Sequence, residues 1–285
     1  MATEAAGTRG SLLARATLRL REAGVAEPRR EALRILADHL GESAGAVLAD
    51  TEAPIEPADL ARLEQLVSRR AAGEPLPYVT GLAGFRRLAL RCDRRALIPR
   101  PETEGLVDLV LERCTGGTIA DIGTGSGCLA LALADEGSFS LVVAVDRSRE
   151  ALGLARENVA LTALGVTLVC GDLTSAFGDS SLDAVVSNPP YLATGEYESL
   201  DPSVRAWEPA AALVSGEDGL EATRRLLADA RRVVGAGGWI ALEVDASRAG
   251  ETAGCARASG WEAVDIYEDL YGRERYLLAR RSDGR

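Results

Sequence analysis

The residues of this sequence that most clearly indicate chemistry lie in the run "SNPPYL", residues 187–192. It follows the apolar stretch "LDAVV", which predicts a buried strand. Asn188 offers a side-chain oxygen and Pro189 a backbone carbonyl, and the two prolines fix φ, so this carbonyl points in a set direction. Two neighbouring acceptors can hold both N–H groups of a planar NH2 group and aim its weakly nucleophilic nitrogen at an electrophilic carbon. The run therefore predicts a site that orients an amide or an exocyclic amine.

The loop "DIGTGSGC", residues 121–128, is a second candidate, because it follows a predicted strand and precedes a predicted helix. Its three alternating glycines let the backbone approach a ligand and adopt positive φ. The spacing differs from the dinucleotide fingerprint G-x-G-x-x-G, since Cys128 stands where that motif has its last glycine. Asp121 at the entrance suits a ligand's ammonium group better than a phosphate. The expected contacts of this loop come from Asp121, Gly123, Thr124, Gly125, Ser126 and Gly127.

Acidic residues also end the next two predicted strands. Asp146 ends "SLVVAVD", where a carboxylate, with Arg147 beside it, can accept from both hydroxyls of a ribose. Asp172 in "CGDL" can accept from an adenine amine, and Leu173 can pack on the ring. Ligands of open α/β sheets bind at the carboxyl ends of the strands, so these residues predict an adenosine-type ligand. The loop lacks phosphate-binding chemistry, which favours S-adenosylmethionine over NAD.

Each of these signals has a structural alternative. The glycines could form only a tight turn, Asp146 could be the N-cap of the next helix, and "NPPY" could simply end a strand in a surface turn. Their order along one α/β unit favours the functional interpretation. In that interpretation a methyl group passes in line from sulfur to nitrogen, and the electron-rich face of Tyr191 covers the acceptor nitrogen.

Alternating strands and helices are expected to position these residues. From Thr118 onward, near-continuous apolar strands are separated by helical segments, which predicts a parallel sheet covered on both faces. The last two strand-like runs are joined at Gly272 without a helix between them, so this final pair should be antiparallel. We therefore expect residues 101–285 to form an α/β domain.

The preceding residues, 1–75, predict a small helical domain. Three amphipathic segments there have proline near the start, glycine at the end, or both. They are "SLLARATLRLREAG", "EPRREALRILADHLG" and "EPADLARLEQLVSRRAAG". Residues 76–100 are expected to form a linker and a β-hairpin, because the residues from Phe85 to Ile98 alternate loosely between apolar and polar.

The composition argues against several classes of function. A net charge of -11 and a pI of about 4.8 oppose stable binding to nucleic acid and to anionic membranes. A single histidine, His39, opposes His-based triads, and five dispersed cysteines without a C-x-x-C pair predict neither a zinc site nor disulfides. We see no apolar run long enough to span a membrane and no signal-peptide pattern. We therefore expect a cytoplasmic protein, acting as a monomer.

Together these residues resemble the HemK/PrmC family of protein-(glutamine-N5) methyltransferases, which modify peptide chain release factors. The resemblance runs from about Glu74 to Arg280 and includes "EPLPYVTG", "LIPRPETE", "ADIGTGSGCLALALA", "SNPPYL" and "GRERYLLAR". "IPRPETE" together with "NPPY" is specific, whereas "NPPY" alone also occurs in DNA adenine-N6 methyltransferases. The helical N-terminal segment is similar in position and size to that family's docking domain.

The resemblance implies a class I S-adenosylmethionine-dependent methyltransferase fold, which is α/β, with a Rossmann-like seven-stranded sheet whose last strand is antiparallel. It also implies methyl transfer from S-adenosyl-L-methionine, leaving S-adenosyl-L-homocysteine, to the glutamine amide of the Gly-Gly-Gln motif in a release factor. The glycine loop would line the methionine part of the cofactor. The glutamine would be held by Asn188, Pro189, Pro190 and Tyr191, with Asn188 also near the cofactor and Arg100 and Thr103 at the mouth of the site.

The sequence departs from this family after the strand "WIALEV". Asp245 stands in place of the glycine of the family's "LEIG" and Arg248 in place of a glutamine, so the acceptor could differ. Three alternatives therefore stay open: an adenine-N6 nucleic-acid methyltransferase, an N-methyltransferase of another small amide or amine, and a non-enzymatic cofactor-binding protein. The acidic pI opposes the first, and the intact Asn188 and Tyr191 oppose the last.

Overall fold

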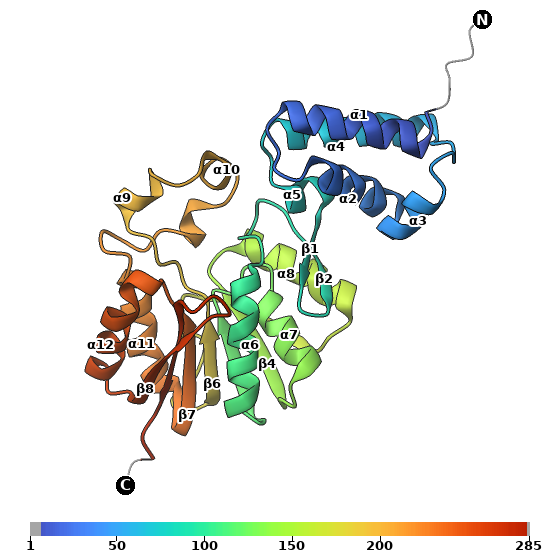
Figure 1. Ribbon diagram of the computed structural model, residues 1–285. Coiled ribbons are helices and arrows are strands. Elements are labelled where there is room, and N and C mark those ends of the chain that lie inside the picture. Colours follow the sequence, from blue (N-terminus) through green and yellow to red (C-terminus); the bar gives the residue numbers. More distant parts are fainter. Residues whose placement is uncertain (1–6, 284–285) are drawn as a thin grey trace, which may run out of the picture. The chain divides into compact units, whose positions relative to one another are not determined.

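The N-terminal part of the chain is a bundle of helices. The computed structural model describes residues 7–283, and the chain divides into two compact units between Leu82 and Ala83. The helices of the first unit are α1 (Arg9–Glu22), α2 (Pro28–Leu40), α3 (Ala44–Ala49), α4 (Pro57–Ala71) and α5 (Leu76–Thr80) (Figure 1). The leucines that set the helical period are buried together in its core, among them Leu12, Leu20, Leu36 and Leu63. The three predicted helices are confirmed.

Two short helices of this unit were not predicted. Ser43 caps α3, because its hydroxyl oxygen accepts from the Ala46 N–H at 3.1 Å. Helix α5 begins after Pro75 and ends at Gly81, whose φ is 76°, inside the segment where a linker was expected. Helices of five or six residues contain too few turns for a hydrophobic period to show, so only their caps mark them.

A β-hairpin begins at Leu82, the last residue of the first unit, and continues into the second. Its strands are β1 (Leu82–Phe85) and β2 (Leu88–Arg91), so it lies earlier than the predicted hairpin. After β2 the carboxylate of Asp93 accepts from the Arg95 N–H at 3.0 Å, and the chain turns away from the hairpin. The loose alternation beyond this turn reflects buried Ala96 and Ile98 and not strand pairing.

Seven strands form the main sheet of the second unit. They are β3 (Thr118–Ile122), β4 (Leu141–Asp146), β5 (Val166–Cys170), β6 (Leu182–Ser187), β7 (Val234–Glu243), β8 (Glu262–Glu268) and β9 (Glu274–Arg280). Their order is β5-β4-β3-β6-β7-β9-β8, and β9 pairs antiparallel with both β7 and β8, whereas the other neighbouring pairs are parallel. The predicted Rossmann-like sheet with its antiparallel last strand is confirmed. The strand order changes direction at β3, where open sheets of this kind bind ligands.

Helices cover both faces of this sheet, as Figure 1 shows. Helices α6 (Pro101–Arg113), α7 (Cys128–Glu136) and α8 (Arg149–Thr162) lie on one face, and α11 (Glu221–Val233) and α12 (Ala249–Ala258) lie on the other. Strand β4 alternates between the two layers, since Val142 and Ala144 face the first layer and Val143 and Val145 face the second. Burial on both faces explains the nearly continuous apolar strands.

Two details of the second unit differ from the sequence prediction. The helical segment "GLEATRRLLADARRVVGAGG", residues 219–238, indicates a helix up to Gly238, but α11 ends at Val233 and β7 begins at the next residue. A Cβ on Gly238 would lie 2.5 Å from the backbone oxygen of Asp183, so a glycine lets β7 approach β6 here. Helix α12 was not predicted, because its buried face consists of small residues such as Ala253 and Ala256.

Candidate functional site

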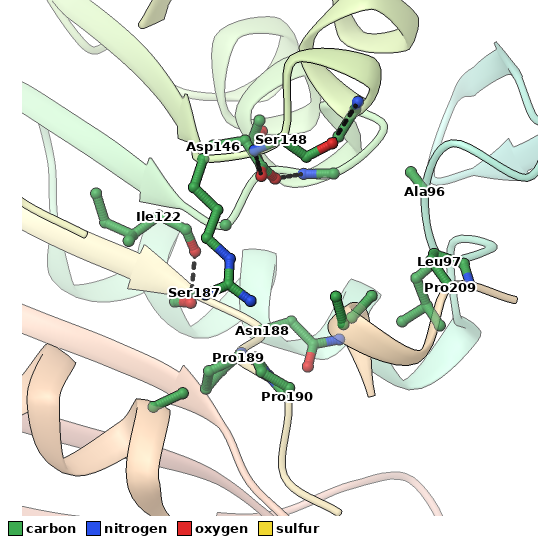
Figure 2. Close-up of a pocket in the computed structure, with 18 of the residues that line it drawn as sticks. Ala96, Leu97, Ile122, Asp146, Ser148, Ser187, Asn188, Pro189, Pro190 and Pro209 are labelled. Carbon is green, nitrogen blue, oxygen red and sulfur yellow. Dashed lines mark hydrogen bonds between the residues drawn. The ribbon is translucent and has the colours of Figure 1, made fainter. Parts of the chain in front are cut away.

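A cavity of about 400 Å³ opens at the carboxyl ends of β3, β4, β5 and β6 (Figure 2). A cavity of this size suits a small-molecule ligand. Most residues that the sequence predicted for the site line it, namely Gly123, Thr124, Gly125, Ser126, Asp146, Arg147, Asp172, Leu173, Asn188, Pro189, Pro190, Arg100 and Thr103. Three predicted residues do not line it: Asp121, Gly127 and Tyr191.

The loop after β3 presents backbone to the cavity. Gly123, Gly125 and Gly127 have φ of 74°, 57° and 85°, a conformation that is costly for residues with a Cβ. Gly127 forms the N-cap of α7, and a Cβ there would lie 3.4 Å from the Cβ of Ala155 in α8. The third glycine therefore shapes the loop and packs it against α8, while the first two line the cavity.

Asp121 lies underneath this loop and is 1% exposed. Its Oδ2 accepts from the Thr124 hydroxyl at 2.6 Å and from the Ala130 N–H at 3.2 Å. Burial raises the pKa of this carboxyl group to about 7. Asp121 therefore does not line the cavity, where it was expected to contact a ligand ammonium group, because its side chain is turned toward the loop and the first turn of α7.

Asp146, at the end of β4, lines the cavity and holds two backbone segments. Its Oδ2 accepts from the Gly125 N–H at 2.9 Å, and its Oδ1 accepts from the Ser148 N–H at 2.8 Å. The N-cap of α8 is Ser148, whose hydroxyl accepts from the Ala151 N–H, and not Asp146. Each carboxylate oxygen can accept a further hydrogen bond, so Asp146 can still receive donors from a ligand.

The end of β5 supplies the next wall of the cavity. Leu173 lines it with a φ of 49°, and its side chain packs on the core beneath. Asp172 is exposed and forms an ion pair with Arg225 of α11 at 2.6 Å. Both predicted residues therefore face the cavity, with the Asp172 carboxylate already paired to a cation.

Asn188 lies directly after β6, with Pro189 and Pro190 beside it (Figure 2). The preceding hydroxyl, that of Ser187, donates to the Ile122 carbonyl oxygen at 2.6 Å and ties the ends of β6 and β3 together. The Asn188 carboxamide is itself fixed, since its Nδ2 donates to the Thr103 hydroxyl oxygen at 3.1 Å. The structure thus brings the two sequence motifs, the glycine loop and "NPPY", to one cavity.

Tyr191 is placed differently from the expectation. Its ring does not line the cavity, and burial raises the pKa of its hydroxyl to about 12, so it stays neutral. Its charged neighbours include Glu243 and Arg275 at the ends of β7 and β9. The Tyr191 ring is therefore not placed along the cavity, where it was expected to cover the acceptor nitrogen.

Two buried acids of this region were not predicted. Glu243 ends β7, is 2% exposed, and accepts from the Thr103 hydroxyl at 2.6 Å. Glu208 pairs with Arg100 at 2.5 Å. Glu243 had a signal in the sequence, since an acid at the carboxyl end of an apolar strand is the same feature that marked Asp146. Glu208 had none, because its partner is distant in the sequence.

Asp245 and Arg248, the departures from the family pattern, do not line the cavity. Asp245 accepts from the Ser247 N–H at 2.9 Å and so forms a local turn. Arg248 donates to the Asp218 carbonyl oxygen at 2.8 Å and to the Glu196 carboxylate at 2.7 Å. They hold the segment after "NPPY" in place, and neither residue is positioned to contact an acceptor in the cavity.

Within residues 7–283, no helix is long and apolar enough to cross a membrane. The same residues contain no group of three or more His, Cys, Asp or Glu side chains placed to hold a metal ion.

Comparison with known proteins adds to this geometry. The chain matches the family models "PrmC N-terminal domain" over residues 11–81 and "Methyltransferase small domain" over residues 102–201. The release factor glutamine methyltransferase of Deinococcus radiodurans is 42% identical over 276 residues, which cover 96% of this chain and 98% of that protein. The protein of the same name from Moorella thermoacetica is 40% identical, over 95% of this chain and 98% of that protein.

A solved structure supports the fold. A methyltransferase from Pyrococcus furiosus matches with a TM-score of 0.52 and 20% sequence identity, over 68% of this chain and 88% of that chain. A match at this identity shows the fold alone, and it agrees with the methyltransferase fold that the sequence predicted.

Proposed function

Because this chain belongs to the release factor glutamine methyltransferase family, we propose that it transfers the methyl group of S-adenosyl-L-methionine to the side-chain amide nitrogen of the glutamine in the Gly-Gly-Gln motif of a peptide chain release factor. The family resemblance inferred from "IPRPETE" and "NPPY" is confirmed. One observation carries the proposal: in a chain that matches these relatives over nearly its whole length, the Asn188 carboxamide and the glycine loop line the same cavity.

The residues present fit S-adenosyl-L-methionine. Gly123 and Gly125 bring bare backbone to the cavity, and Asp146 and Asp172 place carboxylates at the next two strand ends. We propose that the glycine loop holds the methionine part, that Asp146 accepts from the ribose hydroxyls, and that Leu173 packs on the adenine. When bound, this cofactor supplies an activated methyl group on a positively charged sulfur, and S-adenosyl-L-homocysteine is the product.

The protein's own contribution is to orient the acceptor nitrogen. The Asn188 Oδ1 and the Pro189 carbonyl oxygen would accept the two N–H groups of the glutamine amide. An amide nitrogen is a weak nucleophile because its lone pair is delocalised, so holding both N–H groups sets the direction in which the nitrogen can react. The prolines at positions 189 and 190 limit backbone rotation, which keeps the carbonyl acceptor in place before the substrate arrives.

In this proposal the acceptor glutamine is held by the segment after β6 and by the start of α6. Pro190 lies next to the acceptor site, and Arg100 and Thr103 line the same cavity from the start of α6. We propose a supporting role for Tyr191, in which its half-buried side chain stabilises the Asn-Pro-Pro backbone from outside the cavity lining.

The protein partner would be a peptide chain release factor, and the reaction would take place in the cytoplasm. We propose that the helical first unit binds the release factor at a second place, away from the glutamine, and that the enzyme works as a monomer. The net charge of -11 supports a protein partner over a stable complex with nucleic acid. The alternative of a small-molecule acceptor loses its motivation, since Asp245 and Arg248 do not line the cavity.

A methylation assay tests the proposal directly. The protein is incubated with S-adenosyl-L-methionine and a recombinant release factor, and the release factor is digested for mass spectrometry. We expect one added methyl group on the glutamine of the Gly-Gly-Gln motif, and none on a release factor whose motif is changed to Gly-Gly-Ala. An unmodified glutamine, combined with methylation of an adenine-containing DNA or a small amine, would contradict the proposal.

A further inference from the structure

A buried line of hydrogen bonds leads away from the proposed acceptor site. Asn188 Nδ2 donates to the Thr103 Oγ1 at 3.1 Å, and the Thr103 hydroxyl donates to the Glu243 Oε2 at 2.6 Å. Thr103 and Glu243 are each 2% exposed. The three residues of this Asn188–Thr103–Glu243 relay come from the end of β6, the first turn of α6 and the end of β7. We propose that Glu243 is a positioning residue, which acts through Thr103 to turn the Asn188 Oδ1 toward the acceptor.

The direction of the relay follows from its chemistry. An ionised carboxylate can only accept hydrogen bonds, so Glu243 requires the Thr103 hydroxyl to donate to it. This leaves only the lone pairs of the Thr103 oxygen for Asn188. Of the two ends of a carboxamide, only the NH2 group can donate to those lone pairs. The Asn188 Oδ1 is therefore left for the cavity, where it can accept an N–H group of the substrate.

The relay also determines which acceptor group the site favours. This inference about the acceptor depends on the proposed function. With the Asn188 Oδ1 and the Pro189 carbonyl both accepting, the site binds a group that donates twice. The primary amide of glutamine has two N–H groups, whereas the carboxylate of glutamate offers only acceptors and is repelled. Glu243 therefore contributes to the selection of glutamine over glutamate without touching the substrate.

The burial of Glu243 supports a functional role over a structural one. A buried carboxylate costs stability unless it is well compensated, and a neutral side chain of similar size would pack there at a lower cost. The nearest compensation is the Thr103 hydroxyl, together with the more distant charges of Arg275 and Arg100. A neutral glutamine would not fix the relay, because its own NH2 group can donate to Thr103 and let that hydroxyl donate to the Asn188 Oδ1 instead.

Variants of the relay test this inference by kinetics. We expect Thr103→Val and Glu243→Gln each to lower kcat on the release factor about tenfold or more, with the dissociation constant of S-adenosyl-L-homocysteine unchanged. Thr103→Ser keeps the hydroxyl and should restore kcat to near the wild-type value. Thr252→Val is the matched control, since Thr252 is 1% exposed and donates to the Arg248 carbonyl oxygen outside the relay.

The orientation itself is measured without turnover, from the side-chain NH2 resonances of Asn188 in ¹⁵N-labelled protein. We expect these resonances to move in Thr103→Val and Glu243→Gln but not in Thr252→Val. An Asn188 signal unchanged in Thr103→Val, or wild-type kcat in both relay variants, would overturn the inference. A wild-type enzyme that leaves every release-factor glutamine unmodified would instead refute the proposed function, and the Asn188 resonances would still decide whether the relay exists.

Discussion

The Arg100 guanidinium lies 2.5 Å from the Glu208 carboxylate, although 108 residues separate them in the sequence. The other oxygen of Glu208 accepts from the Ile98 N–H at 3.2 Å. Close by, Arg94 stacks over the Trp207 ring at 4.1 Å from its centroid. Both contacts join the segment before α6 to the segment that follows "NPPY", and residues of both segments line the cavity. The pair therefore holds one wall of the proposed cofactor site together.

We predict that Glu208→Gln loosens this wall. The side chain of Glu208 is 2% exposed, so replacing its charge weakens a buried, charge-assisted hydrogen bond worth roughly 1.5–3 kcal/mol. The expected result is a dissociation constant for S-adenosyl-L-homocysteine that rises about tenfold, with faster hydrogen exchange in residues 207–216. Calorimetry and hydrogen-exchange mass spectrometry measure the two effects.

The control for this variant is Glu27→Gln. Glu27 pairs with Arg30 in the first unit, and both side chains are largely exposed, so the substitution should change stability by no more than about 0.5 kcal/mol. If the two variants bound the cofactor equally well, the Arg100–Glu208 pair would have no role in holding the cavity.

Asn188→Ala should separate catalysis from cofactor binding. It removes a preorganised acceptor for the glutamine amide but leaves the glycine loop and Asp146 in place. We expect kcat to fall by about 10²-fold or more, while the affinity for S-adenosyl-L-homocysteine stays close to wild type. Single-turnover methylation of the release factor gives the first quantity and calorimetry the second. A loss of affinity as large as the loss of rate would show that Asn188 mainly builds the cofactor site.

Asp146→Asn should weaken cofactor binding and leave the catalytic rate nearly unchanged, the reverse of the effect of Asn188→Ala. Each Asp146 oxygen accepts from a backbone N–H, that of Gly125 or that of Ser148. An asparagine must present its NH2 group to one of these donors, which leaves an unsatisfied N–H at a cost of about 1–3 kcal/mol. We expect weaker cofactor binding, by about tenfold or more, and nearly unchanged kcat at saturating S-adenosyl-L-methionine. An unchanged affinity would contradict the assignment of Asp146 to the ribose.

The activity should also depend on the ionisation of Glu243. Burial raises the pKa of its carboxyl group to about 7, and only the ionised form fixes the direction of the relay. The groups that face it from neighbouring elements are Thr103, Glu102 and Arg100 of the α6 start, Arg275 and Tyr276 of β9, and Tyr191. We expect kcat to rise as the pH increases through about 7, and this rise to be absent in Glu243→Gln. The same pH profile in both proteins would assign the titration to another group.

Local patterns were sufficient to predict the sheet and several of the residues that line the cavity at its edge. Strand β4 shows its burial on two faces as a continuous apolar run, and Asp146 stands out as the polar residue at its end. Asn188 stands out in the same way, because two prolines follow it and stop the strand. Glycines at positive φ, such as Gly125, can also be recognised in the sequence, because other residues rarely adopt that conformation.

Contacts between residues that are distant in the sequence could not be predicted, because no local sequence pattern indicates them. Thr103 and Glu243 lie 140 residues apart, so no periodicity connects the hydroxyl to its acceptor. The side-chain direction of Asp121 could not be predicted either. A carboxylate at a loop entrance can turn toward a ligand or beneath the loop, and the local sequence pattern is the same in both cases. Here Thr124 and Ala130 supply donors beneath the loop, and they decide the direction.

Asp121→Asn should make the stability of the protein less dependent on pH. The native pKa of Asp121 is raised to about 7 from the ordinary value of 3.8, so between these values the native state keeps a proton that the unfolded state has lost. The free energy of unfolding contributed by this group therefore falls as the pH rises from about 4 to about 7. Asparagine does not titrate. Its carbonyl oxygen can accept from both Thr124 and Ala130, as Oδ2 does. Its NH2 group replaces Oδ1, which has no hydrogen-bond partner in the structure. Urea unfolding at pH 5 and pH 8 measures this difference, and we expect the variant to gain stability relative to wild type at the higher pH. If the stability of the two proteins changed equally with pH, the Asp121 carboxyl group would not be protonated in the folded protein.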